Sequence, residues 1–109
     1  MLCPQLYRQR LIVEFISLVD LLSEQLYIDF LTELTSMLGM TIFFGPVVGN
    51  CKLGPSGWVA WMESGCQIHS FIDYNFIAVD IFSCKPYSAI DVVNLIKKWF
   101  KAEEIEIHE

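Results

Sequence analysis

Three short apolar runs joined by two polar segments fill residues 58–82, which read WVAWMESGCQIHSFIDYNFIAVDIF. The runs cover residues 58–62, 66–71 and 76–82. Their β-branched and aromatic content predicts strands, and the polar segments at residues 63–65 and 73–75 predict turns. The third run is apolar on both faces except at Asp80, so we expect this strand in the centre of the sheet.

The chain before this stretch predicts a strand, a helix and another strand. Residues 11–15 are rich in β-branched side chains and predict the first strand. Apolar residues then recur at helical spacing between Asp20, which we assign as the N-cap, and Gly39, which ends the helix. Residues 41–48 predict the second strand.

The chain after this stretch predicts a second helix and a short strand. Ser88 and Asp91 form a capping box, and apolar residues at helical spacing follow it. Residues 104–107 alternate between acidic and apolar side chains, which predicts an edge strand. We therefore expect an α+β fold, a two-layer sandwich in which two helices cover one face of a mostly antiparallel sheet.

Length and composition predict one domain over residues 1–109 that associates with itself. Hydrophobic residues make up 54% of the chain and charged residues only 18%, so we expect a second copy to cover part of the surface as a homodimer. The net charge of −6, with only seven Lys and Arg residues, argues against a nucleic-acid partner. An acidic chain is compatible with a cationic substrate.

The four cysteines do not follow the spacing of a metal site. Cys3, Cys51, Cys66 and Cys84 include no CxxC pair, so we expect no bound metal, and a small metal or thiol protein is a minor alternative. No run reaches the ~20 apolar residues of a membrane span. The apolar stretch near the start is interrupted by acidic residues and has no signal-peptide cleavage site. We therefore expect a cytoplasmic protein without a membrane partner.

Four side chains that can do chemistry stand at fixed spacing, namely Ser56, Ser64, His69 and Cys84. A serine hydroxyl can attack the carbonyl that precedes it, a histidine can act as a base near neutral pH, and a cysteine can donate a proton. Each residue by itself is common in a turn, a strand or a core. Their joint spacing is what indicates a functional site.

This spacing resembles that of the small prokaryotic S-adenosylmethionine decarboxylases, and the resemblance runs over about residues 8–101. It implies that the chain cleaves itself between Glu63 and Ser64 and turns Ser64 into a pyruvoyl cofactor. Such a group forms a Schiff base with the substrate amine and accepts the electrons that decarboxylation releases. The resemblance also implies a homodimer.

The resemblance further implies a role for each of the other three side chains. Ser56 would support the acyl shift that precedes cleavage. His69 would be the processing base, and Cys84 would later protonate the α-carbon of the substrate. All three positions carry the side chain that the role requires.

The substrate-binding positions match the family less closely. Asp73 stands where the family usually has the Glu that holds the ribose, Phe71 retains an aromatic ring, and Glu14 corresponds to an acid near the family's active site. Gly65 replaces the usual His after the processed serine. Residues 50–53 lack the usual aromatic residue that stacks on adenine.

The leading interpretation is therefore a pyruvoyl-dependent S-adenosylmethionine decarboxylase proenzyme of polyamine and spermidine biosynthesis. Some relatives process themselves in the same way but decarboxylate L-ornithine or L-arginine. The missing aromatic residue before Ser56, together with the altered Gly65 and Asp73, favours that alternative. A second alternative is a catalytically silent partner subunit that activates another chain. The retained Ser64, His69 and Cys84 argue against a silent role.

Overall fold

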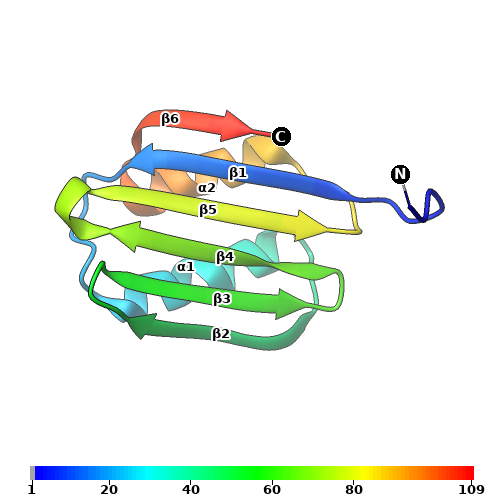
Figure 1. Cartoon of the computed structure of the whole chain (residues 1–109), viewed down its shortest axis with the longest axis horizontal. Coiled ribbons are helices and arrows are strands. Elements are labelled where there is room, and N and C mark those ends of the chain that lie inside the picture. The colour runs from blue at the N-terminus through cyan, green and yellow to red at the C-terminus, as the bar shows by residue number, and fades with distance from the viewer. Residues whose placement is uncertain (1) are drawn as a thin grey trace.

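A computed structural model describes residues 2–109 as one six-stranded antiparallel sheet with two helices. Figure 1 shows both helices behind the sheet, so one face of the sheet is covered and the other, here called the outer face, is open. The strands are β1 Gln9–Ile16, β2 Ile42–Asn50, β3 Pro55–Trp61, β4 Ser64–Phe71, β5 Phe76–Ser83 and β6 Glu103–His108. The helices are α1 Glu24–Met37, α2 Ala89–Phe100 and the short 3-10 helix η1 Ile72–Tyr74. The predicted two-layer α+β sandwich is confirmed.

The strand order is β2-β3-β4-β5-β1-β6, and every neighbouring pair is antiparallel. β5 lies between β4 and β1, which confirms the central position expected from its apolar sequence. The C-terminal strand β6 lies at one edge, also as expected, and β2 lies at the other.

Side chains of the central strands alternate between a buried inner face and the outer face. The hydrophobic core residues of β3, β4 and β5 are at most 3% exposed; they are Val59, Trp61, Cys66, Ile68, Ile77, Val79 and Ile81. The helices cover this face and complete a single core. At its centre the ring of Phe100 on α2 lies 5.4 Å from Phe15 on β1 and 5.2 Å from Phe30 on α1.

The start of α1 differs from the prediction. Its N-cap is Ser23, not Asp20, and Ser23 makes no side-chain capping hydrogen bond. Asp20 instead accepts a hydrogen bond from the backbone N–H of Leu22 at 2.9 Å, which orders the chain before the helix. The predicted cap of α2 is confirmed, because Ser88 Oγ accepts a hydrogen bond from the N–H of Asp91 at 3.2 Å.

Strands β3 and β4 begin earlier than their sequence predicts. β3 includes Ser56, and β4 begins at Ser64. The turn expected over residues 63–65 is therefore shorter, because Ser64 and Gly65 adopt positive φ angles and still pair with β3. A Cβ atom on Gly65 would lie 2.5 Å from the carbonyl oxygen of Val59, so only glycine fits there.

Neither helix is long and apolar enough to cross a membrane, a finding that applies to residues 2–109.

Phe100→Ala should lower the free energy of unfolding by about 3–5 kcal/mol, because it removes a fully buried ring that three aromatic side chains contact. Ile90→Ala on the same helix is the control, since Ile90 is 73% exposed and should change stability by less than about 0.5 kcal/mol. Urea unfolding followed by circular dichroism measures both values. Equal losses would show that Phe100 is not at the centre of the core.

Candidate active site

Ser64 is the first residue of β4 and has a strained backbone. Its φ angle is +145°, in a region that L-residues rarely adopt. Such a conformation costs on the order of 1–3 kcal/mol and persists only where the surroundings impose it. The strain lies directly at the Glu63–Ser64 peptide bond, the bond whose cleavage the sequence predicts.

The carbonyl oxygen of Glu63 accepts two hydrogen bonds from one residue. The backbone N–H of Cys84 donates to it at 2.9 Å, and the Cys84 thiol donates to it at 3.3 Å. Two donors on one carbonyl oxygen polarise the C=O bond and stabilise the negative charge that develops there during nucleophilic attack. The structure therefore brings Ser64, the carbonyl that it would attack and Cys84 together.

The side chain of Glu63 fixes the same turn from the other side. Its carboxylate accepts hydrogen bonds from the N–H of Thr41 at 3.0 Å and from the Thr41 hydroxyl at 3.4 Å. The backbone hydrogen bond from Thr41 is the main cause that lowers the pKa of Glu63. The β3–β4 turn is thus tied to the segment that precedes β2.

Cys84 takes its place from the end of β5. Ser83 pairs with Ser64 across the β4–β5 ladder, so the next residue reaches the turn at Glu63. The buried Ser83 hydroxyl accepts a hydrogen bond from the N–H of Lys85 at 2.9 Å, which bends the chain away from the sheet. Cys84 is half-buried, and its thiol is free.

Ser56 and His69 lie side by side at the opposite end of the sheet. They are cross-strand partners in the β3–β4 ladder and belong to the outer face. His69 is exposed, and its Nε2 atom lies 3.2 Å from Oε1 of Gln67 on the same strand. The sequence does not show this pairing, because it depends on the strand register.

The predicted catalytic residues therefore form two separate groups within one chain. Ser64 and His69 are five residues apart on β4, a separation of about 17 Å along the strand. A histidine side chain does not span that distance, so His69 does not reach Ser64 of its own chain. Cys84 is in the first group with Ser64, and Ser56 is in the second group with His69.

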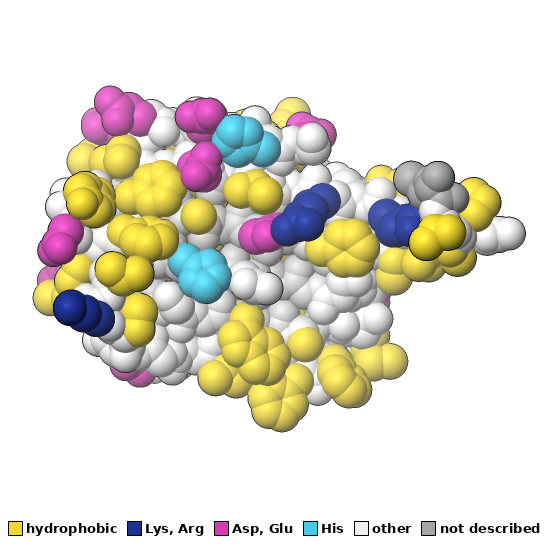
Figure 2. Space-filling model, in the orientation of Figure 1, with side chains coloured by type: hydrophobic (Ala, Val, Ile, Leu, Met, Phe, Trp, Pro, Cys, Tyr) yellow, Lys and Arg dark blue, Asp and Glu magenta, His cyan; other side chains and the backbone are white. Residues whose placement is uncertain are grey.

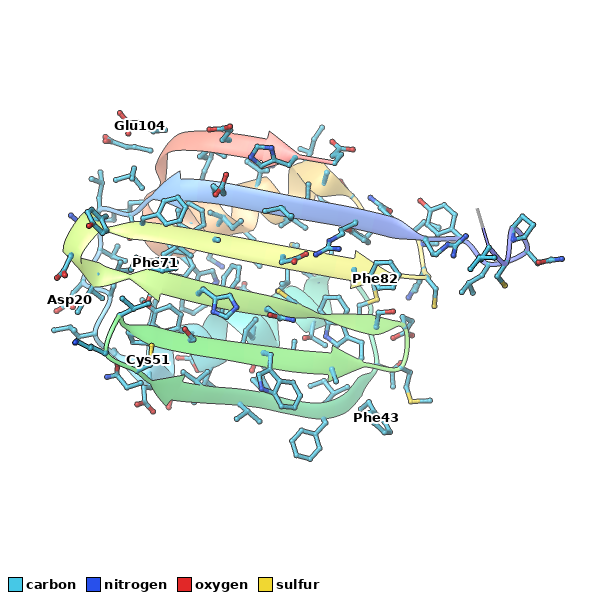
Figure 3. The ribbon with its side chains drawn as sticks, in the orientation of Figure 1. Asp20, Phe43, Cys51, Phe71, Phe82 and Glu104 are labelled. Atoms are coloured by element: carbon cyan, nitrogen blue, oxygen red, sulfur yellow. The ribbon has the colours of Figure 1, made fainter. Side chains whose placement is uncertain are left out.

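The three predicted substrate-binding residues lie toward the His69 end of the sheet. Figure 3 labels Phe71 near that end and Phe82 near the Ser64 end. The ring of Phe71 is 5.7 Å from Phe76, and Asp73 is exposed in η1.

Glu14 belongs to the same outer-face row as His69. The residue between them in this row is Ala78, which pairs with both. The Glu14 carboxylate lies 2.9 Å from Nε2 of His108 on β6, and Glu106 lies 3.5 Å from the same nitrogen. Glu14 is therefore held toward the edge strand β6, away from the Ser64 end of the sheet.

A pocket of about 400 Å³ opens on the outer face beside Ser64. Its lining contains residues that the sequence did not assign to the site; the side chains of the lining include Arg10, Trp58, Gln67, Asp80 and Phe82. A carboxylate in so apolar a strand needs a partner. Arg10 is that partner, with Nη2 and Nε at 2.7 and 3.2 Å from the two carboxylate oxygens of Asp80.

Comparison with known proteins assigns the family. Residues 9–109 match the S-adenosylmethionine decarboxylase family. The chain belongs to this family, whose members are pyruvoyl-dependent decarboxylases. A search of curated protein sequences gives no match.

The fold of this family member also resembles a solved structure. The crystal structure of the adenosylmethionine decarboxylase from Aquifex aeolicus VF5 aligns with a TM-score of 0.74 and 17% sequence identity. The alignment covers 94% of this chain and 88% of the other. At this identity the likeness concerns the fold.

The residues around Ser64 fit the prosthetic group of the family. A pyruvoyl group made from a serine requires a hydroxyl next to a carbonyl that can be attacked. Ser64 follows such a carbonyl, which is polarised by Cys84, and its backbone is strained. Gly65 lies beside Ser64 in the lining of this pocket, packed directly against the backbone of β3.

Cys84→Ala should slow cleavage of the Glu63–Ser64 bond on the order of tenfold to a hundredfold, because it removes one of two donors on the attacked carbonyl. The fraction of cleaved chain against time, measured by mass spectrometry, gives the rate. Cys51→Ala is the matched control, since this exposed thiol lies in the loop between β2 and β3. A Cys84→Ala chain that is cleaved at the normal rate would contradict this role of the thiol.

Proposed function

We propose that this chain is the proenzyme of an S-adenosylmethionine decarboxylase of polyamine biosynthesis, and that it cleaves itself between Glu63 and Ser64. The observation that carries the proposal is the pair of hydrogen bonds from Cys84 to the carbonyl oxygen of Glu63, directly before a strained serine. A structural turn needs neither the strain nor a thiol donor at this carbonyl. Family membership supports the same activity.

Cleavage begins with the hydroxyl of Ser64, which attacks the carbonyl carbon of Glu63. The Glu63 acyl group moves from the nitrogen to the oxygen of Ser64, and the peptide bond becomes an ester. The oxygen that becomes negative during this step is the one that both Cys84 donors contact. Relief of the φ strain at Ser64 favours the shift.

The ester is then broken by removal of the α-proton of Ser64, and His69 is the proposed base. The bond between the ester oxygen and Cβ of Ser64 breaks, and the oxygen leaves as part of the new C-terminal carboxylate of Glu63. Residue 64 is then a dehydroalanine. Water hydrolyses its imine form, and the former Ser64 nitrogen is released as ammonia. The new N-terminus is a pyruvoyl group, which supplies an electron-accepting carbonyl for amino-acid decarboxylation. The Cys84 thiol, already at this end of the sheet, holds a proton at Sγ that it can donate to the substrate α-carbon.

We expect two copies of the chain to form each site, because His69 does not reach Ser64 within one chain. Two outer faces can pack together around a two-fold axis that lies between them and crosses the strands. This arrangement places the Ser64 and Cys84 group of one copy opposite the Ser56 and His69 group of the other. The homodimer expected from the composition is then part of the active site.

The outer face has the apolar surface that such a dimer would bury. Figure 2 shows hydrophobic side chains gathered over β2 and β3. They include Phe44, which is 56% exposed and stacks on Trp58 with ring centroids 5.5 Å apart. Exposed apolar patches of this kind on small proteins mark interfaces or binding sites.

A second candidate substrate class is supported by the loop before Ser56. This loop contains Cys51 and the exposed Leu53 but no aromatic ring for adenine to stack on. L-Ornithine and L-arginine have no adenine, so an enzyme that decarboxylates either of them needs no such ring. Release of carbon dioxide from the three candidate substrates separates these activities.

The mass of the purified chain under denaturing conditions should show two fragments, residues 1–63 and residues 64–109. The second fragment should begin with a keto group in place of the Ser64 amine. Ser64→Ala should remain whole and have no decarboxylase activity, because it lacks the attacking hydroxyl. A Ser64→Ala variant that still releases carbon dioxide would overturn the pyruvoyl mechanism. A wild-type chain that stays uncut would favour the silent partner subunit.

Co-expression of Ser64→Ala with His69→Ala should restore cleavage, although neither variant is cleaved by itself. The His69→Ala chain keeps its own Ser64 and would receive an intact His69 from the other copy. Mass spectrometry should therefore find the fragment 64–109 that carries the His69→Ala change. If that chain is cut only when its own His69 is restored, the proposed dimeric site is wrong.

A further inference from the structure

The ion pair between Arg10 and Asp80 lies in the wall of the pocket beside Ser64. The guanidinium of Arg10 contacts both oxygens of the Asp80 carboxylate, at 2.7 and 3.2 Å. The side chain of Asp80 is 30% exposed and that of Arg10 is 62% exposed. The carboxylate therefore belongs to the wall, whereas most of the cation projects into solvent.

Aromatic rings and an amide complete the surroundings of this carboxylate. Phe82 follows Asp80 by two residues on the same face of β5, and Gln67 is the cross-strand partner of Asp80 on β4. Trp58 pairs in turn with Gln67, so its ring lines the same pocket from β3. A carboxylate between two aromatic side chains is a favourable environment for an organic cation, since ring faces attract positive charge.

The distance from Ser64 to Asp80 suits a substrate that extends away from its reacting amine. Ser64 pairs with Ser83, and Asp80 precedes Ser83 by three residues. The Cα atoms of Ser64 and Asp80 are therefore separated by about 10 Å along the strands. A group bound at Asp80 is then several bonds from the amine that reacts at residue 64.

We propose that Asp80 determines specificity by binding the cationic group that the substrate carries several bonds from its reacting amine, and that Arg10 occupies this position until the substrate displaces it. This inference rests on the proposed function for its substrate, but the pocket is already present in the uncut chain. The shared chemistry is a positive charge, which a sulfonium, an ammonium or a guanidinium group carries.

In the single chain the pair is exposed, so Arg10 is easily displaced from Asp80. Ion pairs between exposed side chains are weak, so competition by Arg10 weakens substrate binding by about 1.4- to 5-fold. Arg10 also prevents the carboxylate from facing an apolar pocket without a partner. Arg10 is less suited to hold the substrate carboxylate permanently. Its Nε and Nη2 atoms both donate to Asp80, so the guanidinium lies against the pocket wall.

Binding is measured by calorimetry on Ser64→Ala, which remains uncut and does not turn over its ligand. Three matched pairs isolate the charge: S-adenosylmethionine with S-adenosylhomocysteine, L-arginine with L-citrulline, and L-ornithine with L-norvaline. At least one cationic member should bind more tightly than its neutral partner. The pair that shows this preference identifies the source of the cation.

Asp80→Asn should weaken binding of the preferred cationic ligand roughly tenfold or more, and binding of its neutral partner less than twofold. Asp80→Glu keeps the charge and should retain most of the preference. Arg10→Gln should strengthen binding of the cationic ligand by about two- to five-fold, because it removes the competing charge. Glu33→Gln and Lys98→Gln are the matched controls, because they remove the corresponding charges from an exposed ion pair between the helices.

Three outcomes would overturn the inference. In the first, no cationic ligand is preferred over its neutral partner. In the second, the preference survives Asp80→Asn. In the third, Arg10→Gln weakens binding of the cationic ligand as Asp80→Asn does. Arg10 would then position the carboxylate or bind the ligand itself. Cleavage of the wild-type chain is scored separately, so an uncut chain that prefers a cation would overturn the proposed function and leave this inference standing.

Discussion

The register of β3, β4 and β5 is the constraint on which the site depends. It pairs Ser64 with Ser83 and so brings Cys84 to the carbonyl of Glu63. It also pairs Ser56 with His69 at the other end of the same strands. A shift by one residue would turn every one of these side chains to the opposite face. The buried inner face, from Val59 to Ile81, opposes such a shift because each of its residues would lose its place in the core.

Strain and hydrogen bonding act together at the β3–β4 turn. Ser64 holds an unfavourable φ angle, and three contacts maintain it: two from Cys84 to the Glu63 carbonyl and one from the Thr41 N–H to the Glu63 carboxylate. Gly65 follows at a position where a Cβ atom would collide with β3. The same contacts that stabilise the strained turn are those that would assist its cleavage. Stability of the fold and reactivity of the bond are therefore linked at this turn.

The outer face of the sheet combines two properties that a monomer would not need together. It carries exposed aromatic side chains, such as Phe44 and Trp58, and it carries His69, Asp80 and Arg10 in ordered rows. A second copy on this face would remove the aromatic surface from water.

The sequence by itself determined the kinds of element, their order and the residue types of the site. Strand and helix signals are local, so the three apolar strands in residues 58–82 and the cap at Ser88 could be identified without tertiary contacts. The N-cap of α1 was misassigned because Asp20 and Ser23 are both good caps, and packing of the preceding segment decides between them. The start of β4 differs from the prediction because the neighbouring strand imposes positive φ angles at Ser64 and Gly65. The start of β3 differs because Pro55 and Ser56 pair with β2, and Ser56 also pairs with β4, contacts that a local pattern does not show. Only the tertiary structure decided that Cys84 contacts Glu63, that Arg10 pairs with Asp80 and that His69 lies far from Ser64. These relations join residues distant in sequence or depend on strand direction, and neither is encoded in local pattern.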